Sequence, residues 1–481
     1  MAFETIYRHE GKLNEETKEK IRAIVPDGFS DSLADRISYS HDYWPIALRW
    51  FLDGKLPSMP DCIVWPENEE QIADIIKIAN QEKVAVVPYG GGSGVMGGVV
   101  AIKGGVVVDV KRMNQVLELD EESLMVRVQS GINGMNFERW LNRHGYTLGH
   151  IPQSLYPSTL GGWLACKAAG QFSTKYGKIE DMVLAIKAVL ADGSIIASKP
   201  VPRSSTGPEV ERLLLGSEGI LGIITEATLK IWLYPEERVF LSFLFSSLAD
   251  ALNAVRRILR RGVYPAVIRI YDENETIRHF YNFEEVKGKI ILIMVLEGDK
   301  KVVELEERVA REECGKDGKE LGEKPVAHWM ETRFDVRDAS KFVPKGFIFD
   351  TVEMSVSWKN AMQLYENVIN ALRGIDGIII ASAHASHFYP QGVCFYFTFG
   401  GLPPRNKNAF DFYMEAWDTM MDACIKSNAS ISHHHGIGIT RKKWLSKEMG
   451  KRMEMLRKIK AVIDENNIMN PGKMGDVNEG D

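Results

Sequence analysis

The sequence predicts a mixed α+β protein with more than one domain. At roughly 150 residues per domain, a chain of 481 residues with 45% apolar content has room for several domains. From Cys62 the pattern runs strand, helix, strand with glycine-rich segments between, whereas beyond Pro235 longer amphipathic stretches alternate with apolar strands. We therefore expect an N-terminal extension over residues 1–60, a first large domain over 61–235, a second α+β domain over 236–430 and a C-terminal segment over 431–481.

The first large domain is expected to begin with two strands around one helix. Residues 62–65 and 84–87 are apolar enough for buried strands, and Asn68 suits the start of the helix between them because Gln71 follows three residues later. Two more strand candidates, 99–102 and 106–110, come after the glycine-rich turn. In the second domain we expect strands at 266–270, 289–296, 378–381 and 393–399, and a charged surface segment over 300–324 with a helix at 303–310.

The first glycine-rich segment lies between strands. Gly92, Gly94 and Gly97 match the dinucleotide-binding spacing, but that motif needs a helix to follow, and here strands follow. A Rossmann domain is therefore not expected. Six glycines in the nine residues 90–98 allow positive φ and close approach of backbone N–H groups to an anion, so the segment can bind a pyrophosphate. A plain tight turn is the alternative.

Two more segments, 149–170 and 216–225, combine glycines, hydroxyl side chains and backbone donors at the ends of strands and helices. A long phosphate-linked cofactor needs such groups.

Composition narrows the class of protein. The net charge of −6 provides no broad basic surface, so we do not expect a nucleic acid partner. The apolar run 290–296 is far shorter than the ~20 residues of a membrane span. The start of the sequence lacks a signal peptide pattern, and five scattered cysteines indicate neither disulfides nor a zinc knuckle. We expect a cytoplasmic protein.

In this order, the three glycine-rich clusters resemble the FAD-binding domain of the vanillyl-alcohol-oxidase type, also called the PCMH fold. Within that superfamily the chain is most similar to the alkylglycerone-phosphate synthases. This resemblance implies a two-subdomain FAD-binding domain, a substrate-binding cap with an antiparallel sheet, and a C-terminal segment that returns to the flavin. It implies non-covalent FAD, because the first cluster has no histidine and His150 matches a residue that the synthases keep beside a dissociable flavin.

The resemblance also implies the residues that hold FAD. They are Tyr89, Gly90, Gly91, Gly92, Ser93, Gly94, Val95, Gln153, Ser154, Ser158, Thr159, Gly161, Gly162, Trp163, Gly216, Glu218, Gly219, Gly222 and Ile223.

The resemblance to the synthases is more specific in the second half of the chain. The segments 266–272, 389–399 and 432–438 line up with synthase segments that carry an arginine, a catalytic tyrosine and a triple histidine. On this resemblance the catalytic residues are Tyr396, His433, His434, His435, Arg269 and His150, and Arg337 contacts the substrate phosphate. No metal ion is implied.

The implied reaction replaces the acyl group of an acyl-dihydroxyacetone phosphate with a fatty alcohol. The tyrosine and histidines remove a proton from C1, the acyl group leaves, and flavin N5 holds the remaining fragment covalently until the alcohol adds. Because a tyrosine pKa is ~10, we expect neighbouring cations to favour the Tyr396 phenolate. On its strand Tyr396 shares a face with Cys394 and Thr398. A buried tyrosine with a satisfied hydroxyl is the alternative.

The other candidates also have structural explanations. Three adjacent histidines diverge in extended chain, so we expect proton transfer and flavin contact rather than zinc, with a surface cluster as the alternative. Arg269 and Arg337 suit bidentate recognition of phosphate or carboxylate, yet either could form a structural ion pair, and Asp338 adjoins Arg337.

Two other functions stay open. An FAD-dependent 2-hydroxy-acid dehydrogenase of the D-lactate or glycolate type shares the fold, but His384 to Gly392 lacks the Asp and Asn of the metal motif of those enzymes. The other is a flavin-binding protein without catalysis. The expected substrate is a small lipid-like, phosphorylated or hydroxy-acid molecule. The resemblance implies a homodimer, and we also expect peripheral contact with a membrane.

Overall fold

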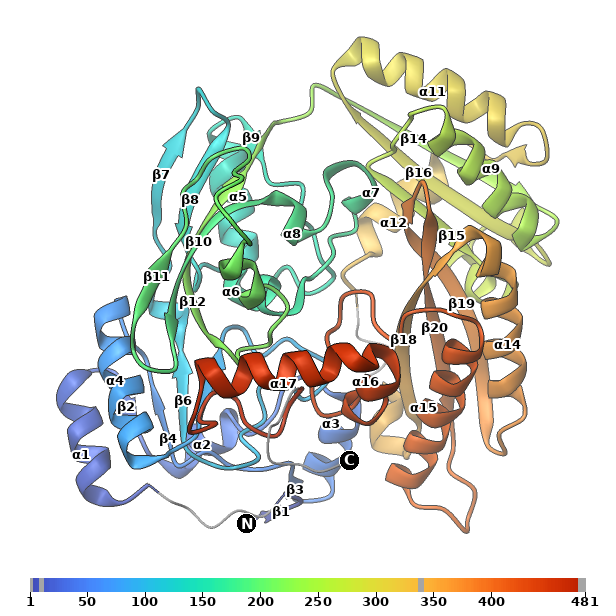
Figure 1. Cartoon of the computed structure of the whole chain (residues 1–481). Coiled ribbons are helices and arrows are strands. Elements are labelled where there is room, and N and C mark those ends of the chain that lie inside the picture. The colour runs from blue at the N-terminus through green and yellow to red at the C-terminus, as the bar shows by residue number, and fades with distance from the viewer. Residues whose placement is uncertain (1–2, 8–12, 336–340, 475–481) are drawn as a thin grey trace.

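The computed structural model describes residues 3–7, 13–335 and 341–474. The chain forms two halves that lie side by side, with the C-terminal helices crossing between them (Figure 1). The architecture is α+β, as the sequence predicts.

The first subdomain is built on a sheet of four strands in the described residues, in the order β2-β4-β6-β5. Its strands are β2 (Phe29–Ser30), β4 (Cys62–Val64), β5 (Val86–Tyr89) and β6 (Val106–Asp109). The last three are parallel and β2 is antiparallel. Helix α4 (Glu69–Glu82) begins where expected, because the Asn68 side chain accepts a hydrogen bond from the Gln71 amide. Its apolar face is buried against this sheet.

The first sixty residues are part of this subdomain. They supply the edge strand β2 and the helix α1 (Glu15–Ile24), which packs on α4. They also contain α2 (Leu33–Ser38), α3 (Pro45–Leu52) and the parallel pair of β1 (Glu4–Thr5) and β3 (Lys55–Leu56). The strand expected at 99–102 is wrong: this stretch consists of turns, because its short backbone bonds link residues two or three apart rather than a neighbouring strand.

The second subdomain holds an antiparallel sheet in which five described strands follow the order β11-β10-β12-β8-β7. They are β7 (Val116–Asp120), β8 (Met125–Gln129), β10 (Val183–Leu190), β11 (Ile195–Ala197) and β12 (Gly222–Lys230). The helices here are α5 (Gly134–Arg143), α6 (Leu160–Cys166), α7 (Ser173–Tyr176) and α8 (Ile179–Met182). A small pair of β9 (Tyr146–Thr147) and β13 (Trp232–Leu233) precedes the second half.

The second half is a cap built on an antiparallel sheet of seven described strands, ordered β17-β14-β16-β15-β19-β20-β18. The strands are β14 (Glu237–Phe245), β15 (Val267–Tyr271), β16 (Ile290–Gly298), β17 (Lys319–Glu320), β18 (Ile348–Ser357), β19 (Ile378–Tyr389) and β20 (Gly392–Gly401). The helices are α9 (Leu248–Arg260), α10 (Glu273–Phe280), α11 (Lys300–Cys314), α12 (Lys324–Thr332), α14 (Ala361–Arg373) and α15 (Ala409–Lys426). Helix α7 of the first half contacts β15 and β19, so this sheet meets the neighbouring domain.

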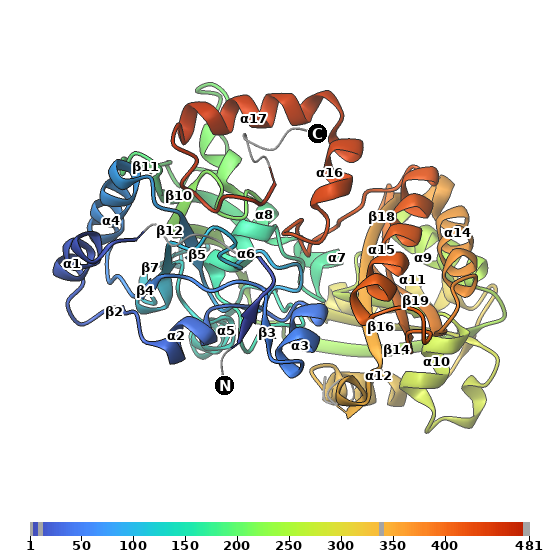
Figure 2. The ribbon, with the colours of Figure 1, turned by 90° about the horizontal axis from the view of Figure 1, so that it is seen from below.

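The C-terminal segment connects both halves. Helices α16 (Lys442–Met449) and α17 (Lys451–Ile463) run from the cap across to the first half (Figures 1 and 2). The chain then returns to the first sheet, where the Val86 amide donates to the Ile468 carbonyl. All five cysteines lie in the described residues and are free thiols. None of the described helices is both long and apolar enough to cross a membrane.

Candidate active site

The glycine-rich turn after β5 lies directly against the segment that begins α6. A Cβ atom on Gly91 would overlap the carbonyl oxygen of Pro157, and one on Gly90 would overlap the hydroxyl of Thr159. Gly92 has a φ of +60°, which favours glycine. These positions need glycine for close approach, and the turn therefore presents its backbone to the start of α6.

The start of α6 gathers hydrogen-bonding groups beside that turn. The Thr159 hydroxyl accepts from the Gly162 amide at 3.4 Å, and the Ser158 hydroxyl accepts from the Trp163 indole N–H at 2.8 Å. A Cβ on Gly161 would lie 3.1 Å from Ser130, whose buried hydroxyl has no partner among the described residues. Backbone amides and hydroxyls therefore meet at one place, which suits a phosphate-bearing group.

His150 lies deeper in the same region. Its ring is 4.6 Å from the Trp163 ring, and neither of its nitrogens has a hydrogen-bond partner in the part of the chain that the structure describes. Burial, with a smaller effect from the charge of Lys178, lowers the pKa of His150 to about 3. The imidazole is therefore neutral, and its buried N–H and ring nitrogen are available to a polar ligand.

The third glycine cluster has a structural role as well. The buried Glu218 carboxylate accepts hydrogen bonds from the amides of Ile437 and Gly438, so it ties the C-terminal segment to the first half. Gly219 packs on Pro88 at the end of β5. Gly222 and Ile223 open β12, and Gly216 lies beside Lys167.

The other residues expected at the cofactor surround this region. Tyr89 packs on Tyr39, and the Gly94 carbonyl accepts from the Tyr43 amide. Ser93 and Val95 flank Gly94 in the same turn, and the Ser154 carbonyl accepts from the Ser158 amide. Gln153 reaches to the cap, where its amide donates to the Arg333 carbonyl at 2.6 Å. Arg337 lies outside the described residues.

The cap places Tyr396 against the triple histidine. Its hydroxyl forms hydrogen bonds with Nε2 of His434 and, at 3.2 Å, with Nε2 of His435. Nδ1 of His434 lies 2.8 Å from Nδ1 of His433, and Nε2 of His433 lies 2.8 Å from the Tyr389 hydroxyl. One tyrosine from β20 and three consecutive histidines thus form a single hydrogen-bonded cluster.

Several contacts hold this cluster at the boundary between the two halves. Lys178 of α8's N-terminus donates to the His433 carbonyl at 2.7 Å, and Ser173 of α7 is 2.6 Å from Nδ1 of His387. Together with the Glu218 bonds, these contacts bring residues of both halves to the same region.

The protonation states of Tyr396 and two of its neighbouring histidines differ from the expected phenolate beside cations. Burial above all lowers the pKa of His433 to about 3 and that of His434 well below its ordinary value. Burial first, and then the charge of Glu353, raises the pKa of Tyr396 well above 10. His433 and His434 are therefore not the expected cations. Tyr396 is itself neutral near pH 7, although the charges of Arg269 and Arg441 act to lower its pKa.

Glu353 of β18 anchors the triple-histidine loop. Its fully buried carboxylate accepts from the backbone amides of His433, His434 and His435 at 2.8–3.1 Å and pairs with the guanidinium of Arg441. Burial alone would raise the pKa of Glu353, but Arg441 and then His435 outweigh it and hold this pKa well below the ordinary value. The loop is thus fixed by one ionised carboxylate.

Arg269 projects from β15 beside the tyrosine. Its guanidinium lies 2.6 Å from Nε2 of His384 and donates to the Tyr271 hydroxyl at 2.8 Å. The His384 ring in turn stacks on Tyr396 with centroids 4.9 Å apart. Among the described residues the hydrogen-bond partners of Arg269 are His384 and Tyr271 and not a carboxylate, so the structural ion pair is not formed there. Its charge is available to an anion.

The sequence interpretation missed three residues of this cluster. His384 and His387 were noted only as an incomplete metal motif, and Glu353 was not noted at all. His384 lies opposite Tyr396 in the β19–β20 register, and His387 has a φ of +55° at a bulge in that pairing. Such strain in a non-glycine residue is common at functional sites. Nitrogens of His387, His433 and His434 lie within 4.8 Å of one another.

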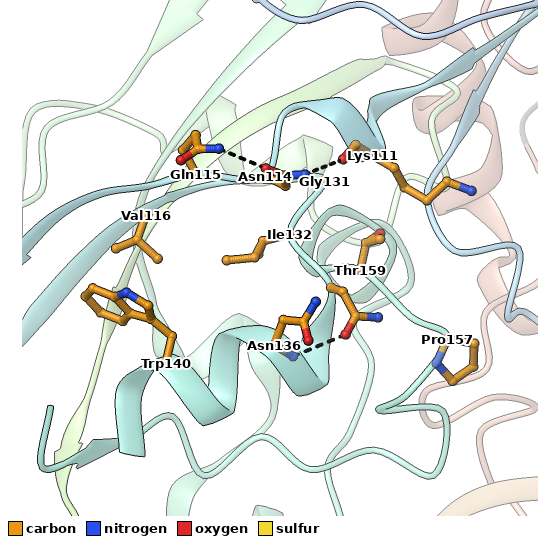
Figure 3. Close-up of a pocket in the computed structure, with 11 residues that line it drawn as sticks. Lys111, Asn114, Gln115, Val116, Gly131, Ile132, Asn136, Trp140, Pro157 and Thr159 are labelled. Atoms are coloured by element: carbon orange, nitrogen blue, oxygen red, sulfur yellow. Dashed lines mark hydrogen bonds between the residues drawn. The ribbon is translucent and has the colours of Figure 1, made fainter. Parts of the chain in front are cut away.

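A separate cavity of about 450 Å³ opens at the junction of the two subdomains of the first half (Figure 3). Its lining includes Lys111, Asn114, Asn136 and Trp140. It shares Thr159 with the expected cofactor residues and contains none of the tyrosine and histidine cluster. It is therefore not the place where that cluster acts.

The comparisons with known proteins fit this geometry. Residues 60–198 match the family described as FAD binding domain, and residues 234–474 match the family of FAD linked oxidases, C-terminal domain. The chain belongs to the FAD-linked oxidase family. It is therefore an FAD-dependent enzyme, and the cradle of glycine backbone, Ser130, the start of α6 and His150 fits that cofactor.

Among relatives, this flavoenzyme is 31% identical to the alkyldihydroxyacetonephosphate synthase of Dictyostelium discoideum over 98% of its own length and 83% of that protein. It is 32% identical to an uncharacterised FAD-linked oxidoreductase of Escherichia coli (strain K12), with coverages of 86% and 88%. It is 28% identical to the glycolate oxidase subunit GlcD of Bacillus subtilis (strain 168), with coverages of 96% and 97%. A solved alkyldihydroxyacetonephosphate synthase has a TM-score of 0.81 at 29% identity, with coverages of 97% and 87%. At 15% identity, p-cresol methylhydroxylase shares the fold, with a TM-score of 0.76 and coverages of 97% and 98%.

Proposed function

We propose that this flavoenzyme replaces the acyl group of an acyl-dihydroxyacetone phosphate with a fatty alcohol. The similarity to alkyldihydroxyacetonephosphate synthases over nearly the whole chain supports the reaction class. One observation carries the proposal. The Tyr396 hydroxyl is hydrogen-bonded to two histidines, and the guanidinium of Arg269 lies nearby, against the His384 ring that stacks on Tyr396. A proton acceptor and an anion-binding group are thus close together.

The substrate chemistry matches these two groups. C1 of the substrate lies between an ester oxygen and the C2 carbonyl, so its proton is acidified, and the substrate also carries a phosphate. Arg269 would bind the anionic part by charge-assisted hydrogen bonds, and the Tyr396 oxygen would receive the C1 proton. When bound, FAD supplies the electron-accepting isoalloxazine ring.

We propose that the protein binds FAD non-covalently, by hydrogen bonds and packing alone. The glycine turn offers no histidine to the flavin, and the buried His150 imidazole is a neutral hydrogen-bonding group. Denaturing the purified protein should therefore release free FAD, whereas a yellow polypeptide after denaturation would contradict this.

A second candidate is oxidation of a 2-hydroxy acid. The similarity to the Bacillus subtilis glycolate oxidase subunit supports it, and Arg269 would suit a carboxylate as well as a phosphate. The two reactions differ in electron balance. Oxidation of a hydroxy acid leaves reduced FAD, whereas exchange of an acyl group for an alcohol changes no oxidation state overall.

The test is an assay of the FAD-loaded protein under anaerobic conditions. With acyl-dihydroxyacetone phosphate and a fatty alcohol, we expect an ether product and released fatty acid in equal amounts. The variant Tyr396→Phe should keep its FAD and lose at least ~100-fold in kcat, because it lacks the acid–base hydroxyl. The matched control Tyr281→Phe, at an exposed position, should behave as the wild type. Near-normal turnover by Tyr396→Phe would refute the role of that tyrosine.

A further inference from the structure

Four side chains form one continuous row of hydrogen bonds. It runs from the Tyr396 hydroxyl to Nε2 of His434, from Nδ1 of His434 to Nδ1 of His433 at 2.8 Å, and from Nε2 of His433 to the Tyr389 hydroxyl at 2.8 Å. Tyr389 is half-buried and ends β19, and the turn residues Pro390 and Gln391 that follow are exposed. The row therefore leads from the cluster toward the surface.

Because the imidazoles are neutral, all hydrogen bonds of such a row must point the same way along it. Each neutral ring has one N–H donor and one acceptor nitrogen, and both rings use both nitrogens here. If Tyr396 donates, then His434 must donate to His433 and His433 must donate to Tyr389. If Tyr389 donates, every bond reverses. The row thus has two arrangements with the same atoms and no charge, which differ only in the position of the protons.

We propose that Tyr396, His434, His433 and Tyr389 form a proton relay that carries the substrate proton to the surface. In the first arrangement, Tyr396 receives the substrate proton on oxygen as its own proton moves to His434. The Nδ1 proton of His434 moves to His433, the Nε2 proton of His433 moves to Tyr389, and the Tyr389 hydroxyl proton passes to water. One proton enters and one leaves. The row ends in the second arrangement, and all four groups are neutral. When C1 regains a proton as the ether product forms, Tyr396 donates it, each bond of the row reverses, and water returns a proton to Tyr389, so the first arrangement is restored.

This relay rests on the proposed function and explains how Tyr396 acts as a base there. A free phenolate is disfavoured because Tyr396 is buried near the Glu353 carboxylate. A standing imidazolium is disfavoured because His433 and His434 are buried as well. Passing each proton on as the next arrives avoids both charged states. The charged groups nearest to the surface end are Lys178, Glu180 and Asp181, which flank His433 and Tyr389.

A bound metal ion would exclude the relay. His387, His433 and His434 could offer nitrogens to one ion. The Nδ1 atoms that join His433 to His434 would then be engaged by the ion or turned apart. A metal-bound cluster and a hydrogen-bonded relay can therefore be distinguished in the same protein sample.

The test removes the outer end of the row. In the FAD-loaded protein, Tyr389→Phe deletes the last hydroxyl without touching Tyr396. With the substrate that the wild type converts, we expect unchanged FAD content, unchanged KM and a kcat at least about tenfold lower. Imidazole buffer at constant pH and ionic strength should raise the kcat of this variant and leave the wild type unchanged, because a small base can accept the proton from His433. The control Tyr365→Phe removes a different hydroxyl, one that donates to Asp272 and has no bond to the row, and should leave kcat unchanged.

The relay is overturned if Tyr389→Phe turns over like Tyr365→Phe, or if buffer does not restore its kcat. Stoichiometric bound metal whose removal by a chelator abolishes turnover would also overturn it. If the wild type converts none of the candidate substrates, the proposed function fails. The relay can then still be tested by proton NMR of the protein without a substrate. It predicts strongly downfield N–H proton resonances from His433 and His434 that shift in Tyr389→Phe and persist in Tyr365→Phe. Their absence from the wild type contradicts the relay.

Discussion

The carboxylate of Glu353 and the guanidinium of Arg441 form an ion pair in which neither side chain is exposed. The same carboxylate accepts three consecutive backbone amides of the triple-histidine loop. Two ions removed from water need such a set of bonds to offset their desolvation. This pair therefore sets the position of the histidines that contact Tyr396.

Glu353→Gln should destabilise the protein by about 3–5 kcal/mol, because it leaves a buried guanidinium without its countercharge. The free energy of unfolding from denaturant titration measures this loss. The control Asp74→Asn breaks an ion pair between exposed side chains, with Lys77, and should change little. A Glu353→Gln protein as stable as the control would show that the carboxylate does not anchor the loop.

Stability should fall as the pH drops below neutral. The pKa values of His150, His384, His387, His433 and His434 are all lowered in the folded protein, mainly by burial. Their stabilisation is fully present above the unfolded value of about 6.5 and is lost as pH falls toward the folded values, about 3 for His150 and His433. Each contributes up to about 1.4 kcal/mol per pH unit within that window.

Unfolding free energies measured between pH 7 and pH 5 test this, since their slope reports the number of protons taken up on unfolding. His144→Gln, at an exposed position, should leave the slope unchanged. A flat profile across this range would contradict neutral, buried histidines.

Arg269→Lys should weaken binding of an anionic substrate. Lysine keeps the charge but lacks the planar fork that binds a phosphate or carboxylate at two points, so we expect KM to rise about 10- to 100-fold with FAD retained. The matched change Arg260→Lys, at an exposed position of α9, should have no effect. An unchanged KM for Arg269→Lys would place the anion elsewhere.

Gly91→Ala should reduce FAD binding. Its added methyl group would overlap the Pro157 carbonyl oxygen and push the glycine turn away from the start of α6. We expect the dissociation constant for FAD, followed by flavin fluorescence, to rise at least about tenfold, since a separation of these segments costs more than 1.4 kcal/mol of binding. Gly374→Ala, after α14 in the cap, brings its methyl group to 3.3 Å from the Ala371 carbonyl oxygen, a much smaller conflict than at Gly91, and should bind FAD normally.

The α+β class and most of the strands could be predicted from the sequence, because the patterns that indicate them are local. The apolar run of β16 and the Asn68 cap of α4 can be read without knowing their neighbours. Residues 99–102 were mistaken for a strand because valine and isoleucine favour strands, whereas the glycines on both sides allow turns there.

The site was predictable only where a resemblance supplied it. Tyr396 and the triple histidine are 37 residues or more apart in the chain, and no local pattern shows that they meet. Glu353 was missed because an isolated glutamate in a strand gives no sign of burial; its partners come from 80 to 88 residues later. The protonation states were also mispredicted, because they depend on desolvation, which only the folded arrangement shows.

The central claim is that the tyrosine and histidine cluster acts on an anionic carbonyl substrate beside bound FAD. The most direct measurement is the flavin spectrum of the purified protein, recorded anaerobically while products are identified by mass spectrometry. The account predicts a yellow protein that forms an alkyl ether from acyl-dihydroxyacetone phosphate and a fatty alcohol, with the flavin oxidised at the end. A protein that binds no FAD would contradict it, as would one that forms no ether and is bleached by glycolate or D-lactate.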